Sequence, residues 1–327
     1  MAKSIHQDAL IVDSLIVSDW EPDVFQSLHR GGLTAINATC AVWENFRETA
    51  ENIAQWHQWF AQHGDLIMPV RHTDDIAAAK QAGKVGIILG FQNASPFEDR
   101  PDFVRLFKSM GVGVVQITYN NQNLIGSGAY ESTDSGLSDF GRMIVHEMNA
   151  AGVAVDLSHV GPKTSADAIQ HSNKPVCFSH ANPMALKQHV RNKEDGLLRA
   201  LVDKGGYVGV NLFSIFMPDH ANARIDDVTV MLDYLIDLIG DDHIGIGTDL
   251  TQGHGAEFFR WICMINGQGD LVLDIPEEDQ GMVIRKADDY GLITQALEKH
   301  GYSEDRVRKI MGLNFIRFLK DAWNEGD

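Results

Sequence analysis

The chain is short of positive charge and of long apolar runs, and each shortage excludes a class of protein. It carries 27 lysines and arginines against 45 aspartates and glutamates, a formal net charge of -18. Nucleic acids and anionic membranes are therefore poor partners, because binding them relies on basic side chains. No run approaches the roughly 18 apolar residues that a membrane helix needs. No Gly-x-Gly-x-x-Gly follows the first apolar run, so nothing suggests a dinucleotide site.

The ends of the chain and its cysteines point to the cytoplasm. The start, "MAKSIHQDALIVDS", lacks the basic and apolar regions of a secretory signal, and the charged end, "RFLKDAWNEGD", does not resemble a lipid-anchor tail. Cysteine is scarce, with Cys40, Cys177 and Cys263 making an odd count. The first two fall in apolar runs, where a reduced and buried thiol is expected. We expect a cytoplasmic protein.

Eight short apolar runs rich in β-branched residues recur along the chain and predict buried strands. They occupy residues 9–17, 35–42, 85–91, 112–119, 153–159, 174–180, 206–213 and 244–250. Strands that are apolar throughout are typical of a parallel sheet covered by helices on both faces. Amphipathic helical patterns, such as "SDFGRMIVHEMNAAG", lie between them and often end at Gly. We predict an α/β fold, a (β/α)8 TIM-type barrel with C-terminal closing helices, as one domain over residues 1–327.

Active sites of such barrels form at the carboxyl ends of the strands, so the last residues of each run are the candidates. The runs "VDLSH" and "VCFSH" end in His159 and His180. Two histidines that close consecutive parallel strands would lie side by side and suit one zinc ion, although a lone histidine is more often structural. Asp249 closes the eighth run, where it could bind metal, act as a general base or simply cap the following turn.

Long motifs in the second half of the chain resemble the membrane (renal) dipeptidase family of zinc peptidases, a branch of the amidohydrolase-like barrels. They read "QITYNNQNLIGSGAYESTDSGLSDFGRMIVHEMNAAGVAVDLSHVGPKTSADAI", "PVCFSHANPMALKQHVRNKEDGLLRAL" and "DDHIGIGTDL". The likeness covers nearly the whole chain and is densest over residues 112–250.

The resemblance implies a role for several residues. His159 and His180 match the histidines of the family's second zinc site, and Asp249 matches the aspartate that moves protons. Arg191 matches the arginine that holds the substrate's C-terminal carboxylate, and we place Asn120 beside it in substrate binding. Tyr119 stands where some members carry a histidine that polarises the tetrahedral intermediate.

Three positions depart from the family pattern. The family's first zinc takes a His-x-Asp at the end of strand one and a glutamate on strand three that bridges both metals. This chain has Leu15, Val17 and Gln92 at those places. Aliphatic side chains offer no lone pair, and a glutamine lacks the charge that would offset two dications about 3.5 to 4 Å apart. We expect one zinc per chain, or none, held by His159 and His180 with Asp249 or the Gln92 oxygen.

Other histidines are weaker candidates for a replacement ligand. The "HQD" at residues 6–8 fits His-x-Asp literally, but it precedes the first strand and should lie at the wrong end of the barrel. His220 and His254, in loops on the correct side, have no spacing argument behind them. Met217, Phe258, Phe259 and Trp261 could line a substrate pocket or simply pack.

Three functional hypotheses follow. The first is a mononuclear metal hydrolase that acts on a dipeptide or an N-acyl amino acid with a free carboxylate, in a mouth gated by residues 251–280. The second is a metal-free relative that binds small carboxylates or regulates another protein. The third, an isomerase or lyase run by Asp249 and Tyr119, has nothing in the sequence that selects it. Relatives commonly form homodimers, and we expect the same here.

Overall fold

The computed structural model describes residues 4–272 and 281–325, and its centre is one parallel sheet. The strands hydrogen-bond in the order β1-β2-β4-β5-β6-β7-β8-β9, and every pairing is parallel. The strands of this path are β1 (Val12–Ile16), β2 (Ala35–Ala41), β4 (Val85–Phe91), β5 (Val112–Gln116), β6 (Ala154–Asp156), β7 (Cys177–Phe178), β8 (Tyr207–Val210) and β9 (Ile244–Ile246). Every residue in them is buried, as the apolar runs predict.

The sheet closes into a barrel through the first strand and the residues that follow the last one. The Val17 N–H donates to the Leu250 carbonyl at 3.0 Å, and the Asp249 N–H donates to the Leu15 carbonyl at 3.0 Å. The buried Asp13 carboxylate strengthens this seam because it accepts hydrogen bonds from the Leu15 N–H at 2.9 Å and from the Thr248 hydroxyl at 2.6 Å. The predicted eight-stranded barrel is therefore confirmed.

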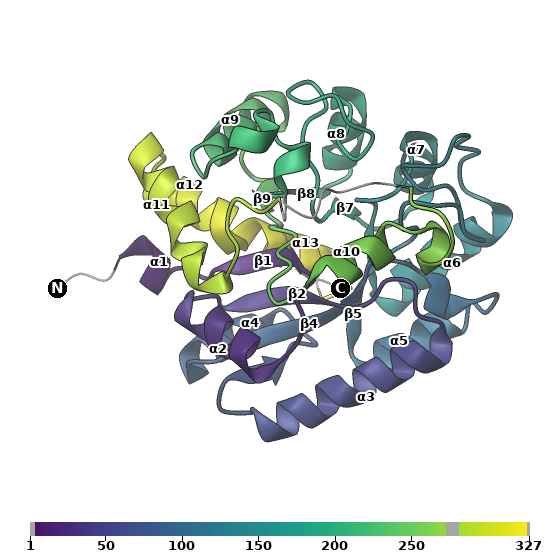
Figure 1. The fold of residues 1–327 in the computed structure, drawn as a ribbon, viewed down its shortest axis with the longest axis horizontal. Helices are drawn as coiled ribbons and strands as arrows, with labels where there is room; N and C mark the ends of the chain where they lie inside the picture. The colour runs from purple at the N-terminus through teal and green to yellow at the C-terminus, as the bar shows by residue number, and fades with distance from the viewer. Residues whose placement is uncertain (1–3, 273–280, 326–327) are drawn as a thin grey trace.

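Helices surround the barrel between successive strands (Figure 1). They are α2 (Pro22–Arg30), α3 (Phe46–Gln62), α4 (Asp74–Ala82), α5 (Phe103–Met110), α6 (Asp139–Ala151), α7 (Pro162–His171), α8 (Asp195–Val202) and α9 (Asp227–Ile239). Helices α5 and α6 end at Gly111 and Gly152, both with a positive φ that a side chain would strain. Within the described residues no helix is long and apolar enough to cross a membrane.

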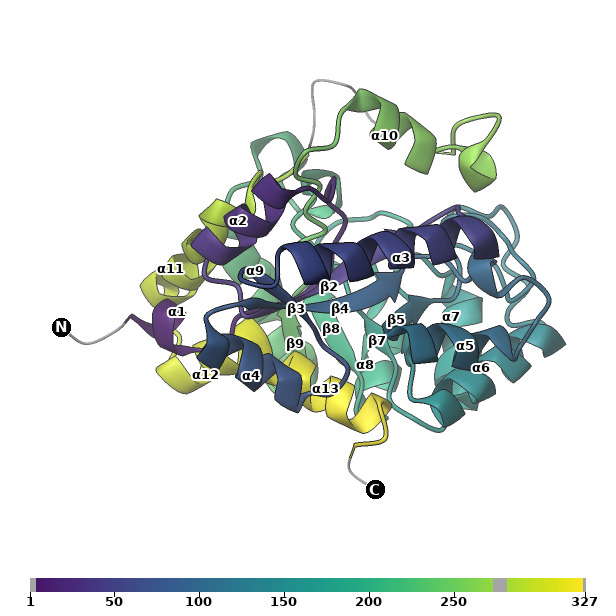
Figure 2. The ribbon, with the colours of Figure 1, turned by 90° about the horizontal axis from the view of Figure 1, so that it is seen from below.

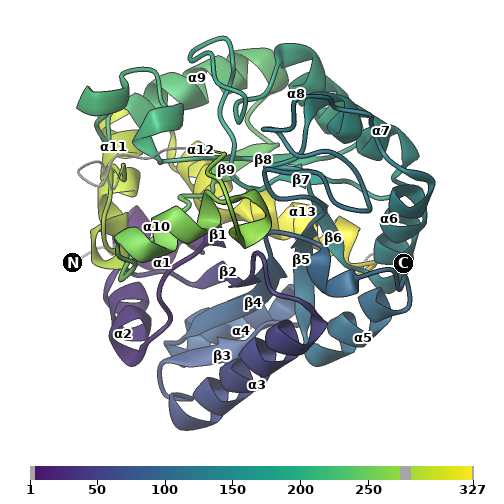
Figure 3. The ribbon, with the colours of Figure 1, turned by 45° about the vertical axis from the view of Figure 1, so that its right-hand side comes forward.

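The remaining helices are α1 (Ile5–Asp8), α11 (Gly291–His300), α12 (Glu304–Arg308) and α13 (Asn314–Ala322). Helix α11 lies beside α9 in the surrounding layer, whereas α13 packs across one end of the barrel against β1, β6, β8 and β9. The α10 helix (Ala256–Ile262) lies over the other end: Figure 3 shows it across the strands, and Figure 2 shows it apart from the surrounding helices. Residues 251–272 thus lie over the mouth as predicted, whereas residues 273–280 of the expected gate lie outside the described residues.

The structure departs from the sequence-based prediction in two details. A ninth strand, β3 (Ile67–Pro69), pairs with β4 beside the main path, and its three residues, ending in proline, gave no strand signal. The strands are also shorter than the apolar runs: β6 ends at Asp156 and β7 at Phe178. The residues beyond those ends form turns, and these turns carry the candidate site.

Candidate active site

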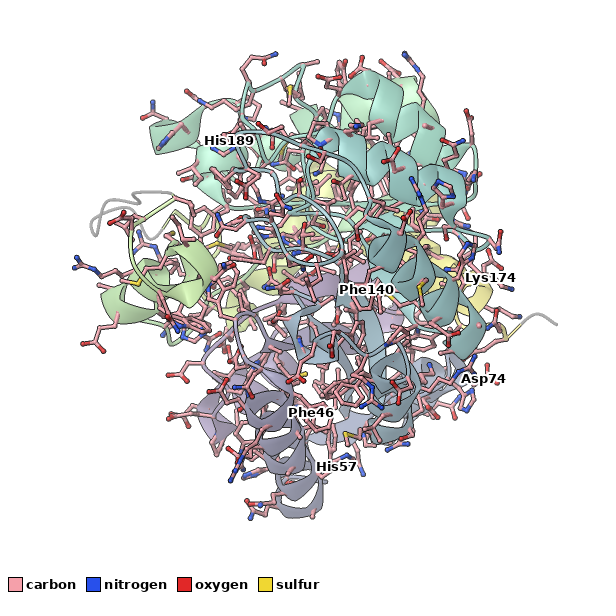
Figure 4. The ribbon with its side chains drawn as sticks, turned by 90° about the vertical axis from the view of Figure 1, so that its right-hand side faces the viewer. Phe46, His57, Asp74, Phe140, Lys174 and His189 are labelled. Atoms are coloured by element: carbon pink, nitrogen blue, oxygen red, sulfur yellow. The ribbon has the colours of Figure 1, made fainter. Side chains whose placement is uncertain are left out.

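The predicted site residues gather at the carboxyl ends of the strands. Gln92 follows β4, His159 follows β6, His180 follows β7 and Asp249 follows β9, and all four side chains are buried. Figure 4 fixes the direction of the barrel, because His189, after β7, lies on the same side as α10, whereas Lys174, before β7, lies on the opposite side. The site therefore lies at the end of the barrel that α10 covers.

A buried carboxylate shapes the two turns that carry the histidines. Asp156 Oδ1 accepts the Ser158 N–H at 3.0 Å and the Ser179 N–H at 3.0 Å. Both serine hydroxyls also donate to Asp156, at 2.6 Å from Ser158 and 2.5 Å from Ser179. The Ser158 hydroxyl oxygen in turn accepts a hydrogen bond from the His180 backbone N–H at 3.1 Å. Asp156 was not among the predicted site residues, although its place two residues before Ser158 is typical of a side chain that stabilises its own turn.

The two histidine rings lie close together, with centroids 5.0 Å apart. His159 Nδ1 lies 2.7 Å from Asn120 Oδ1, and the ring stacks on Tyr119 at 4.0 Å. His180 Nδ1 lies 2.7 Å from the Ser179 hydroxyl. Among the described residues neither Nε2 atom has a hydrogen-bond partner, although both are buried. Burial, and then the nearby Arg191, lowers the pKa of both histidines well below the usual value, so both rings are neutral.

Gln92 places a third unpartnered polar atom at the ends of the strands. Its amide N–H donates to the Thr39 hydroxyl at 3.1 Å, which leaves the buried Oε1 without a partner in the part of the chain that the structure describes. Leu15 and Val17, at the end of β1, are 2% and 7% exposed and offer no ligand atom. The end of β1 is thus aliphatic.

Arg191 brings a positive charge to the same end of the barrel. Its side chain is 2% exposed, packs over the Phe216 ring at 5.4 Å and donates from Nη1 to the Ser158 carbonyl. Its Nε and Nη2 atoms have no hydrogen-bond partner among the described residues. Burial lowers the pKa of this guanidinium, but the pKa of an arginine lies so far above neutral pH that the side chain stays charged. A carboxylate is the natural partner for two free N–H groups of this kind.

Asp249 and Tyr119 complete a small cavity with Arg191. Asp249 has a φ of 60°, a strained conformation for a non-glycine residue, and accepts a hydrogen bond from Asn211 at 3.1 Å. Burial raises the pKa of its carboxyl to about 6. Burial likewise raises the pKa of Tyr119 well above its usual value, so the phenol keeps its proton. A carboxylate that titrates near neutral pH beside a phenol donor suits proton transfer.

The cavity is narrow and is covered by the α10 segment. Its volume is about 40 Å³, room for about three water molecules at roughly 10–15 Å³ each. Its walls are Tyr119, Asn120, Tyr130, His159, Arg191, Phe213, Phe216, Asp249, Ile262 and Cys263. Since Ile262 and Cys263 belong to the end of α10, this segment forms part of the cavity wall.

The structure does not gather a larger set of metal ligands. Within the described residues no group of three or more His, Cys, Asp and Glu side chains lies close enough to hold a metal ion. His254 stacks on Phe258 in a different cavity, and His220 lies in a short 3₁₀ helix after β8. His6 of "HQD" lies in α1 and contacts Thr294 and Gly31, away from the mouth. The expected ligand set of His159 and His180 with Asp249 or Gln92 stays a prediction.

Eight parallel strands with two histidines, an arginine and a carboxylate at their carboxyl ends define an amidohydrolase-like barrel. Residues 22–258 match the membrane dipeptidase family, peptidase family M19. The chain belongs to this family of hydrolases. The family includes metal-dependent peptidases.

Individual relatives agree with this assignment. An uncharacterized dipeptidase of Schizosaccharomyces pombe is 30% identical over 84% of this chain and 62% of its own length. The chain thus spans about three fifths of that relative. An amidohydrolase from Pseudomonas aeruginosa, of known structure, is 45% identical with a TM-score of 0.94 over 98% of both chains. A metallo peptidase from Rhodobacter sphaeroides, solved with a phosphinate mimic of the dipeptide L-Ala-D-Ala, is 19% identical with a TM-score of 0.78 over 96% of this chain and 99% of its own, a likeness of fold.

Proposed function

We propose that the protein is a mononuclear metal-dependent hydrolase of a small amide that carries a free carboxylate, such as a dipeptide or an N-acyl amino acid. One observation carries the proposal. Two buried histidine Nε2 atoms without partners lie beside an arginine whose Nε and Nη2 are also without partners in the described part of the chain. Buried polar atoms are rarely left unpaired unless something else binds them.

The histidine pair fits a zinc ion. Asn120 Oδ1 accepts the Nδ1 proton of His159, so His159 Nε2 carries a free lone pair. The Ser179 hydroxyl, which donates to Asp156, can accept the Nδ1 proton of His180 in the same way. Gln92 Oε1 is the best third donor, although amide oxygen is a weak ligand for zinc. When bound, the metal would supply Lewis acidity and lower the pKa of a water molecule toward 7.

A second metal does not fit. We interpret Leu15 and Val17 as the places where the family's first-site ligands are missing, since both are buried aliphatic side chains. Gln92 is neutral, so it cannot offset the repulsion between two adjacent dications. Both arguments favour a single metal of modest affinity.

The protein's own residues would bind and protonate the substrate. Arg191 would hold the carboxylate through Nε and Nη2, since Nη1 is already used by Ser158. Asp249, with a pKa of about 6, would take up and return a proton, and the neutral Tyr119 phenol would donate to the oxygen that becomes negative. The dipeptide mimic held by the Rhodobacter sphaeroides relative supports a small peptide as substrate.

The first test is metal content, measured by inductively coupled plasma mass spectrometry on protein purified without chelator or metal-affinity resin. We expect about one zinc per chain, lost in His180→Ala and kept in His57→Ala, since His57 is exposed on α3. Zinc content that is equal in the two variants would refute the site, and two zinc ions per chain would refute a mononuclear centre. Hydrolysis of dipeptides should follow zinc content.

A second candidate function, binding of a small carboxylate without hydrolysis, is favoured by the lack of a group of three acidic, histidine or cysteine ligands in the described chain. In that case Arg191 alone explains the binding. Calorimetric titration of chelator-treated protein with an N-acetyl amino acid and with its amide separates the two. Binding of the acid without any turnover after zinc is restored favours this alternative.

A further inference from the structure

A second cavity lies beside the active site and takes no part in the chemistry described so far. Its volume is about 220 Å³, larger than the active-site cavity. Its walls come from the ends of β1 and β2, from α3 and from the α10 segment. Its walls are Val17, Ser18, Asp19, Trp20, Thr39, Cys40, Ala41, Val42, Glu44, Asn52, Gln55, Trp56, Trp59, His254, Phe258 and Trp261.

The walls are unusually aromatic. Four of the six tryptophans of the chain, Trp20, Trp56, Trp59 and Trp261, line this cavity. The Trp56 ring centroid lies 5.1 Å from that of Trp20 and 5.0 Å from that of Trp59. The Trp20 indole N–H donates to the Thr39 carbonyl at 2.8 Å, which fixes its ring. A ready-made group of indole rings is a site for a flat apolar group or for a cation, because indole faces are electron-rich.

The charges on the walls decide between these two ligands. Asp19 and Glu44 line the cavity, and no lysine or arginine is among its described lining residues. Glu44 is held in place, because it accepts the Val42 N–H at 2.7 Å and lies 3.5 Å from the Asn52 amide. Burial lowers the pKa of His254 to about 4, so this ring adds no positive charge at neutral pH. Two carboxylates and four indoles together favour a cation.

We propose that this aromatic cavity binds an organic ammonium group, either a quaternary ammonium or an alkylammonium on an apolar body. Cation–π attraction from the indoles and Coulomb attraction from Asp19 and Glu44 act together on such a ligand. An uncharged molecule of the same shape gains only the apolar contact. The proposal concerns binding alone and does not require hydrolysis.

The position of the cavity suggests how such a group would reach it. Trp261 lines the aromatic cavity, whereas the next two residues, Ile262 and Cys263, line the active-site cavity with Arg191. The two cavities are therefore neighbours with opposite charge preferences. If the proposed function holds, a substrate would carry its carboxylate to Arg191 and an ammonium group toward Trp20 and Trp59.

The test compares choline with its uncharged carbon analogue, 3,3-dimethylbutan-1-ol, by isothermal titration calorimetry on the full chain. Tryptophan fluorescence gives a second readout. We expect choline to bind at least tenfold more tightly than the alcohol. Equal affinities would overturn the proposal by showing a merely apolar cavity, and no saturable choline binding at tens of millimolar would also overturn it.

Matched variants locate the binding and separate this proposal from the hydrolase proposal. Trp59→Leu should weaken choline binding at least tenfold, Trp59→Phe should weaken it less, and Glu44→Gln should weaken it severalfold. Trp43→Phe, outside the cavity, should leave it unchanged. Arg191→Met and removal of zinc should also leave it unchanged, so failure of the hydrolase proposal would not affect this result. Circular dichroism of each variant confirms folding, and unaltered affinity in folded Trp59→Leu would refute the site.

Discussion

Replacing Arg191 with methionine should change stability and ligand binding in opposite directions. The side chain is 2% exposed, and its Nε and Nη2 atoms have no hydrogen-bond partner among the described residues. Leaving buried donors unpaired costs about 1–3 kcal/mol each. Methionine removes both donors and keeps much of the volume, although the Ser158 carbonyl loses the donor Nη1 and the contact with Phe216 changes. We expect a net gain of about 1–2 kcal/mol in the free energy of unfolding.

Binding of a carboxylate should weaken in the same variant. Two charge-assisted hydrogen bonds from Nε and Nη2 are worth about 1.5–3 kcal/mol each. Losing them should raise the dissociation constant of an N-acetyl amino acid about 100-fold, which corresponds to about 3 kcal/mol. Urea unfolding and calorimetric titration measure the two quantities on the same preparations. Arg191→Lys is the control, because it keeps the charge but not the two-pronged geometry, and should bind with intermediate affinity.

An Arg191→Met variant that is less stable than the wild type by more than about 1 kcal/mol and binds the acid unchanged would refute both expectations. That result would mean that the arginine is satisfied within the protein and serves the fold. If Arg191→Met lost binding but kept its stability, Arg191 would still be the carboxylate-binding residue. The Nε and Nη2 groups would then be hydrated in the free protein.

Three further predictions concern single buried side chains. Because Asp249 has a raised pKa of about 6 and works as a base when ionised, kcat/KM should be full above pH 6 and fall about tenfold per pH unit below it. Asp249→Asn should abolish this fall of kcat/KM at low pH, and an unchanged pH profile would contradict the role of Asp249 as the base. Gln92→Glu should bind zinc at least tenfold more tightly, as measured by equilibrium dialysis. Without zinc it should have a lower melting temperature, because an unpaired buried carboxylate is costly. Unchanged zinc affinity would exclude residue 92 as a ligand. Burial raises the pKa of Asp13 from 3.8 to about 7, so the stability it contributes is complete below about pH 4 and is lost as the pH rises through 7. Asp13→Asn should therefore remove about 3 kcal/mol of the pH dependence of unfolding between about pH 5 and pH 8.5, and a wild-type dependence in that variant would contradict the raised pKa.

The strands were predictable because a parallel barrel buries both faces of each strand. The runs are mostly apolar, as 85–91 is throughout, and the structure places a strand within every one. The ends were not predictable. "VDLSH" reads as continuous strand, but Asp156 accepts the Ser158 N–H and turns the chain before His159. A side-chain hydrogen bond competes here with the strand ladder, and apolar patterning does not record it.

The site was predictable only in part. The place of His159 and His180 follows from their position at strand ends, since parallel strands bring those ends together. Arg191 lies in a loop, so only the resemblance to the dipeptidase family drew attention to it. The aromatic cavity joins residues from 17 to 261, and single tryptophans far apart in sequence carry no signal that they meet.

The hydrogen bonds of Asp156 have a consequence for any mutational study of the two histidines. One carboxylate holds the turns before both His159 and His180, and the Ser158 hydroxyl links one turn to the backbone of the other. Substitutions in the two turns should therefore be non-additive, since residues within one hydrogen-bonded network show interaction energies of about 0.5–3 kcal/mol. The two turns form one thermodynamic unit. A double-mutant cycle across Ser158 and Ser179 therefore measures the coupling between the two turns, and the effects of mutating His159 and His180 cannot be treated as independent.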